Sequence, residues 1–94
     1  MAPIGVLTLH LHIGHSHSLK DKRQVLRSLK DRLRRNHNVS VAETEFQDTW
    51  QRSSVVVVAV ASERTHLEEM LGRVERDASR LLADDLVSCE TELL

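Results

Sequence analysis

The stretch HSHSLKDKRQVLRSLKDRLRR, residues 15–35, holds the strongest helix signal of this sequence, and the predicted fold is built around it. Ser18 is a good N-cap and Asp21, three residues later, supplies the acidic member of a capping box, so we expect a helix to begin at Leu19. Apolar side chains then recur at spacings of three and four, which places them on one helical face. That face consists of Leu19, Val25, Leu26, Leu29 and Leu33, with Lys22 in the same stripe. The helix should therefore pack its leucines against a core.

A second stripe on the same helix is wholly basic. It lies about 100° round the helix from the apolar stripe and consists of Lys20, Arg23, Arg27, Lys30 and Arg34. Residues 20–35 hold eight Lys or Arg and two Asp, whereas the rest of the chain holds five Lys or Arg and twelve Asp or Glu. The formal net charge of −1 therefore conceals one strongly basic element, which suits a polyanion such as RNA or an acidic protein surface.

The composition indicates one compact domain over residues 1–94. Of its 94 residues, 40% are hydrophobic and 29% are charged, a balance that is typical of globular proteins. A domain of this size buries only a modest core, so a sheet face left uncovered would be a serious loss of buried surface. We therefore expect it to form a homo-oligomer. The lone Cys89 fits a reducing cytoplasm. Because neither a signal peptide nor a span of about 20 apolar residues is present, a cytoplasmic protein without membrane contact is predicted.

Strands are expected on both sides of the basic helix. Residues 4–13 alternate between apolar and polar side chains, with a leucine face that should meet the helices. Residues 39–45 alternate again after a turn. Residues 53–61 carry valine on both faces, which is typical of a central strand covered on both sides. Residues 86–94 form the last strand, on which Val87 and Cys89 should share one face.

A second helix is expected before the last strand, capped by Ser62 or by Thr65. Its buried stripe should consist of Leu67, Met70, Leu71, Val74, Ala78, Leu81 and Leu82. The charged side chains of its other faces, among them Asp77, are interpreted as a solvated surface with salt bridges. The order β-α-β-β-α-β predicts the ferredoxin-like α+β fold, a four-stranded antiparallel sheet with both helices on one face.

This topology brings two distant segments, residues 10–23 and 47–52, to the same edge of the sheet. They should form a polar corner that contains Ser18, Lys22, Gln47 and Asp48. Within it we expect a contact between Lys22 and Asp48. The only tryptophan of the chain, Trp50, lies in the same turn. It either stacks on a base or anchors a partner, or it covers the top of the core.

Three short motifs carry a family resemblance. The segments SLKDKR (18–23), NVSVAE (38–43) and QDTWQR (47–52) together resemble the YlxP-like family of small uncharacterised bacterial proteins. The resemblance covers essentially the whole chain. It implies a ferredoxin-like fold and no established enzymatic activity. Genes of the family often lie beside genes for ribosome maturation and translation initiation, which implies a role near ribosomal RNA.

The leading hypothesis is therefore a non-enzymatic accessory factor that binds ribosomal RNA or a ribosome-associated protein through the basic stripe. Residues expected to contact nucleic acid are Lys20, Arg23, Arg27, Lys30, Arg34, Trp50 and Arg52. A merely solvated basic face is the alternative interpretation. A second hypothesis is a protein-interaction module that forms homo-oligomers through the open sheet face opposite the helices, which includes Val6 and valines of the third strand and is apolar enough to attract a two-fold partner.

Four histidines precede the basic helix. His10 and His12 share a strand face, and His15 and His17 lie in the connection that follows. Three or four imidazoles at such positions can approach one metal ion. However, no fixed-spacing Cys/His motif accompanies them, so surface or interface histidines are the favoured interpretation.

A hydrolase is the third hypothesis. It would use the histidine cluster with a metal, or His17, Asp48 or Glu43 as acid and base. The sequence contains no nucleophile elbow, no phosphate-binding glycine loop and no metal motif. Neither a catalytic residue nor a cofactor is therefore predicted.

Overall fold

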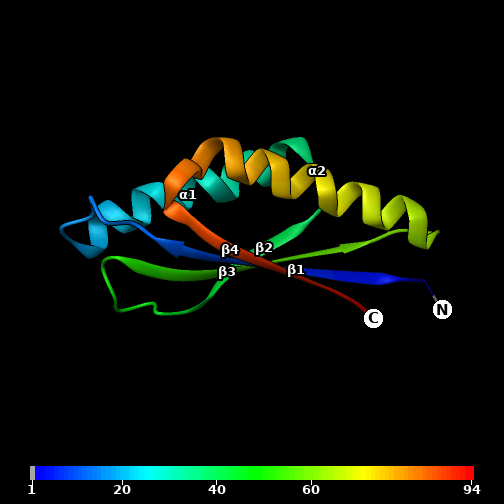
Figure 1. Ribbon diagram of the computed structural model, residues 1–94, viewed down its shortest axis with the longest axis horizontal. Helices are drawn as coiled ribbons and strands as arrows, with labels where there is room; N and C mark the ends of the chain where they lie inside the picture. Colours follow the sequence, from blue (N-terminus) through cyan, green and yellow to red (C-terminus); the bar gives the residue numbers. More distant parts are fainter. Residues whose placement is uncertain (1) are drawn as a thin grey trace.

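The computed structural model describes residues 2–94 and shows the predicted order of elements (Figure 1). The elements are β1 (Ile4–His12), α1 (Leu19–Asn36), β2 (Ser40–Glu45), β3 (Arg52–Val60), α2 (Arg64–Leu82), the short 3-10 helix η1 (Ala83–Asp85) and β4 (Leu86–Leu93). Within residues 2–94, neither long helix has the length and apolar character that crossing a membrane requires.

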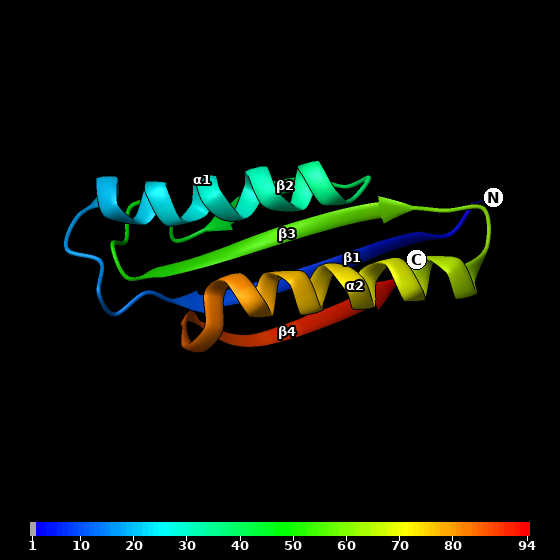
Figure 2. The ribbon, with the colours of Figure 1, turned by 90° about the horizontal axis from the view of Figure 1, so that it is seen from above.

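The four strands form one antiparallel sheet in the order β2-β3-β1-β4. The central strands β1 and β3 pair along their whole length, from Ile4 opposite Val60 to His12 opposite Arg52. Seen from above, α1 lies over the β2–β3 side of the sheet and α2 over the β1–β4 side, so both helices cover one face (Figure 2). This arrangement confirms the ferredoxin-like α+β fold.

The helix α1 begins at the predicted residue because Ser18 caps it. The Ser18 hydroxyl accepts a hydrogen bond of 3.0 Å from the backbone N–H of Asp21. In return, the Asp21 carboxylate accepts a hydrogen bond of 2.9 Å from the backbone N–H of His17. These two bonds satisfy donors that a helix N-terminus would otherwise leave without partners.

The core lies between the helices and the covered face of the sheet. Leu7 and Leu9 of β1 are fully buried, as are Leu29 of α1 and Leu67 of α2. The closest approach is at Gly5, where an added Cβ would lie 2.5 Å from Cδ1 of Leu71. The helix α2 therefore packs directly on the backbone of β1.

The helix α2 differs from the prediction at both ends. Its N-cap is Glu63, which makes no side-chain capping bond, so the prediction of a Ser62 or Thr65 cap is wrong. Leu81 is exposed, although it was expected in the buried stripe. Since Leu82 lies one turn beyond the buried Ala78, it takes the last core position, and Leu81 is turned about 100° away from the sheet.

The face of the sheet opposite the helices is open (Figure 1). Val58 and Val60 on this side of β3 are 38% and 53% exposed. The prediction that this strand is covered on both sides is therefore wrong for the single chain, because both helices lie on one face. Val87 is also exposed, because the register between β1 and β4 shifts after His10 and separates Val87 from the face of Cys89.

Candidate nucleic-acid interface

The basic stripe of α1 borders a groove of about 540 Å³ between α1 and the edge strand β2, called here the α1–β2 groove. Its lining comprises Arg23, Leu26, Arg27, Lys30, Asp31, Arg34 and Glu43. Four of the five predicted helix cations therefore meet in one concavity. Lys20 is exposed in the first turn of the helix and does not belong to the lining.

The electrostatic balance of the α1–β2 groove is positive. Glu43 is already paired, because its Oε2 lies 2.9 Å from Nζ of the buried Lys22. Arg34 donates a hydrogen bond of 2.8 Å from Nη2 to the backbone oxygen of Val41, which covers one peptide group at the edge of the sheet. Among residues 2–94, no salt bridge is formed by Arg23, Arg27 or Lys30. Their positive charges are therefore available to an anion.

The predicted polar corner forms at the start of α1. The backbone N–H of Ile13 donates a hydrogen bond of 2.7 Å to the backbone oxygen of Gln51. The Gln51 side chain donates from Nε2 to the carbonyl oxygens of Gly14 and Ser16, both at 3.1 Å. The connection before α1 and the turn between β2 and β3 are therefore joined at one end of the molecule (Figure 1), as the topology predicts.

Lys22 is at the centre of this corner, with only 1% of its side chain exposed. Besides its ion pair with Glu43, its Nζ donates to the backbone oxygen of Phe46 at 2.6 Å, with longer contacts to the backbone oxygens of Gln47 at 3.4 Å and Arg52 at 3.3 Å. The ammonium group thus holds the turn through its carbonyl groups. Gln47 contributes only its main chain to this contact.

The predicted contact between Lys22 and Asp48 is wrong. Asp48 is exposed and, within the described part of the chain, forms no salt bridge. The lysine instead reaches beneath the turn, where Phe46 has a positive φ of 65°. Its backbone oxygen accepts hydrogen bonds from both Lys22 and the N–H of Thr49 at 3.0 Å. Because a bulky residue is disfavoured at positive φ, these bonds help to maintain the turn.

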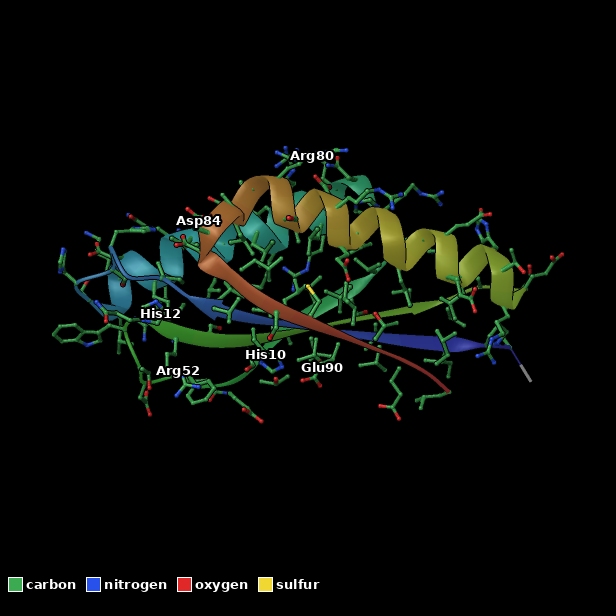
Figure 3. All side chains as sticks on the ribbon, viewed as in Figure 1. His10, His12, Arg52, Arg80, Asp84 and Glu90 are labelled. Atoms are coloured by element: carbon green, nitrogen blue, oxygen red, sulfur yellow. The ribbon has the colours of Figure 1, made fainter. Side chains whose placement is uncertain are left out.

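The two predicted contact residues outside α1 do not line the α1–β2 groove. Trp50 is 53% exposed and lines a separate hollow of the turn, which excludes the alternative that it covers the core. Arg52 lies on the open side of the sheet, whereas the labelled Arg80 lies on the helical side (Figure 3). The guanidinium carbon of Arg52 is 4.2 Å from the centroid of the Phe46 ring, an internal cation–π contact.

The four histidines are not gathered into one cluster. His10 and His12 lie on the open side of the sheet (Figure 3), while Nε2 of His15 lies 3.0 Å from Oδ2 of Asp85 in η1. His17 contributes its backbone N–H to the start of α1. In the part of the chain that the structure describes, no group of three or more His, Cys, Asp or Glu residues is placed to hold a metal ion.

A hydrogen-bonded chain of serine, histidine and glutamate crosses the open sheet face. Nδ1 of His10 lies 3.1 Å from Oγ of Ser54, and its Nε2 lies 3.2 Å from Oε1 of Glu90. The order of groups is that of a hydrolase triad, but Ser54 is only 2% exposed. Burial shields the Ser54 hydroxyl from a substrate carbonyl, and the three side chains link β3, β1 and β4 to one another.

On its other flank, α1 contacts a buried carboxylate of α2, whereas the charge pattern of α2 predicts a solvated surface there. Asp77 of α2 is only 7% exposed. Its Oδ1 accepts a hydrogen bond of 2.6 Å from Nε of Arg32, and its Oδ2 contacts Nδ2 of Asn36 at 3.1 Å and Nε2 of His37 at 3.0 Å. Burial alone would raise the pKa of Asp77, but these hydrogen bonds and the charge of Arg32 lower its pKa from 3.8 to about 2. Asp77 therefore joins the two helices as a carboxylate.

Comparison with known families matches residues 4–91 to the family described as "Protein of unknown function (DUF503)". The chain belongs to this family. The uncharacterized protein YlxP of Bacillus subtilis (strain 168) is 42% identical over 71 residues, which cover 76% of this chain and 77% of that protein. The YlxP-like resemblance is thus confirmed, and the family description names no activity.

Two solved structures show that the fold of this DUF503 chain also occurs in unrelated sequences. The de novo designed protein Foldit4 matches with a TM-score of 0.61 at 12% identity, covering 100% of this chain and 97% of that one. A de novo designed protein with a ferredoxin fold matches with a TM-score of 0.54 at 10% identity, covering 100% and 84%. At such identities the likeness shows the fold alone, so a function must be argued from the residues of this chain.

Proposed function

We propose that this protein is a non-enzymatic cytoplasmic accessory factor that binds RNA, free or within a ribonucleoprotein such as the ribosome, through the α1–β2 groove. The supporting observation is that Arg23, Arg27 and Lys30 line one concavity without a salt bridge among residues 2–94. Fixed positive charge in a concave surface attracts a polyanion and raises its association rate.

The side chains of the groove suit phosphate groups. A guanidinium binds phosphate through two parallel hydrogen bonds, and a lysine ammonium binds it as a point charge. Within residues 2–94, the groove lining contains no aromatic side chain on which a base could stack. Binding should therefore tolerate many base sequences and weaken steeply with salt, because phosphate contacts position a backbone and carry little sequence information.

The affinity for a labelled single-stranded RNA, measured by fluorescence anisotropy over a series of KCl concentrations, tests this function. Each phosphate contact contributes about 0.7 to the slope of log K against log salt for single strands. The slope is negative, so the variant R23E/R27E should reduce its magnitude by about 1.4. The variant R23K/R27K keeps both charges and should retain most of the slope.

A matched control is R64E, which reverses an exposed arginine at the N-terminal end of α2, outside the groove. It should leave the slope unchanged, because it removes no phosphate contact. If R23E/R27E binds RNA with the salt dependence of R64E, or if the wild-type protein binds no RNA, the proposed function is refuted.

Self-association through the open sheet face is a second candidate function, favoured by the exposed valines. The apolar patch on the two central strands consists of Ile4, Val6, Val56, Val58 and Val60. A second copy is the occupant that we propose, because a two-fold rotation places this uncharged patch on itself. Glu90 and Glu92 lie on the edge strand β4 and remain at the rim. The protein would then act as a dimeric interaction module, which measurement of its mass in solution tests.

A further inference from the structure

The groove between α1 and α2, called here the α1–α2 groove, has the composition of an anion site. Its volume is about 430 Å³, and its lining includes the four arginines Arg32, Arg73, Arg76 and Arg80 with one carboxylate, Asp77. Arg80 points outward on the helical side of the molecule (Figure 3). This groove is separate from the α1–β2 groove, because no residue lines both.

Asp77 does not neutralise the arginines of α2. Both of its oxygens are engaged by α1 and its C-cap, through Arg32 at 2.6 Å, Asn36 at 3.1 Å and the C-cap His37 at 3.0 Å. Among residues 2–94, none of the α2 arginines in the lining forms a salt bridge. The groove therefore keeps three uncompensated cations on one side.

The α2 arginines are spaced so that they repel one another along the helix. Arg76 follows Arg73 by three residues and precedes Arg80 by four, so Arg76 has a like charge one turn away on each side, and like-charge neighbours destabilise a helix. Nη1 of Arg76 lies 3.3 Å from the position that a Cβ would occupy on Gly72, so this guanidinium lies along the helix. An anion held in the groove would relieve the repulsion.

The outer surface of α1 connects the two grooves. At about 100° per residue, Asp31 is near the point of α1 most distant from the sheet, with Arg27 on the α1–β2 side and Arg35 on the α1–α2 side. All three side chains are exposed. A phosphate backbone that crosses α1 would therefore meet arginine on both sides and a single carboxylate between them.

We propose that the α1–α2 groove is a second phosphate-binding site. This inference rests on the function proposed above: one RNA backbone crosses α1 and contacts both grooves. Arginine is the residue suited to this role, because its planar guanidinium matches two phosphate oxygens at once.

The salt dependence of RNA binding tests the crossing. R76E/R80E should reduce the magnitude of the slope of log K against log salt by about 1.4 for single-stranded RNA. R76K/R80K should keep the slope, and R64E on the same helix should leave it unchanged. Circular dichroism of R76E/R80E checks that the fold is retained. If R76E/R80E has the slope of R64E while R23E/R27E reduces the magnitude of the slope, this inference is overturned and the proposed function stands.

A titration with pyrophosphate examines the groove without RNA. In NMR spectra of the arginine Nε–H groups, signals of Arg76 and Arg80 should move with added pyrophosphate, and the signal of Arg64 should not. The absence of such shifts overturns the phosphate site even if RNA binds through the α1–β2 groove. Shifts with pyrophosphate but an unchanged RNA slope in R76E/R80E would identify a free phosphate ligand and overturn the RNA crossing.

Discussion

At the level of single residues, Lys22 is both a buried core residue of α1 and one member of an ion pair. Its position belongs to the apolar stripe of α1, and its side chain is buried there, but its ammonium forms an ion pair of 2.9 Å with Glu43. Lys22→Met should lower the free energy of unfolding by about 3–5 kcal/mol, because the partly buried Glu43 carboxylate loses its counter-ion. Urea denaturation measures this change.

The double variant K22M/E43Q separates the ion pair from the packing. With the carboxylate neutralised, it should be more stable than Lys22→Met alone, since no buried charge remains without a partner. A double variant as unstable as the sum of the two single variants would contradict this explanation.

Asp77 is expected to make stability depend on acid pH. Its pKa is about 2 in the folded protein against an ordinary value of 3.8. Since the folded pKa is the lower one, the carboxylate contributes its full stabilisation of about 2 kcal/mol above pH 3.8 and loses it as the pH falls towards 2. Urea denaturation of the wild type and Asp77→Asn should therefore show a stability difference that shrinks over this range. A constant difference would show that Asp77 does not stabilise the protein as a carboxylate.

At the scale of elements, two glycine-to-alanine variants probe the placement of α2. Gly72 is inside this helix, and the nearest atom to an added Cβ is the flexible end of Arg76 at 3.3 Å. Gly72→Ala should therefore raise stability by about 0.5–1 kcal/mol through higher helix propensity. At Gly5 the added Cβ would lie 2.5 Å from the buried Leu71, so Gly5→Ala should lower stability by about 1–3 kcal/mol. Thermal unfolding followed by circular dichroism should show a higher melting temperature for Gly72→Ala and a lower one for Gly5→Ala. Changes in the same direction would contradict this packing.

The two helices differ in how far the sequence determines their ends. The start of α1 follows from local chemistry, because Ser18 and Asp21 bond to backbone groups within four residues of themselves. The start of α2 has no such side-chain bond at Glu63. A local side-chain bond therefore does not fix where α2 begins, and the capping motif at Thr65 predicted the wrong residue.

At the scale of the whole molecule, the open sheet face predicts a dimer. Val58→Glu should convert it to a monomer without unfolding it, because a charge in the apolar patch would be buried between the two copies. The matched control is Leu81→Glu, at a side chain with nearly the same exposure, 37% against 38%, outside the apolar patch. Light scattering at micromolar concentrations gives the mass, and a wild-type monomer would exclude the dimer.

The order of elements, the core faces of β1 and α1 and the basic stripe could be predicted from the amino-acid sequence, because each depends on a local period of two or of three to four residues. The sequence also located the polar corner, since the ferredoxin-like topology brings the end of β1 and the turn before β3 to one edge. These features require no knowledge of which side chains meet.

The partners of the charged groups, by contrast, depend on how the elements pack against one another. Whether Lys22 pairs with Glu43 or Asp48, and whether Asp77 faces solvent or α1, depends on side-chain contacts between segments far apart in the chain. Periodicity assigns a residue to a face but does not show what lies opposite it. For the same reason the sequence revealed the arginines of α2 only as surface charge, whereas packing against α1 makes them the wall of a groove.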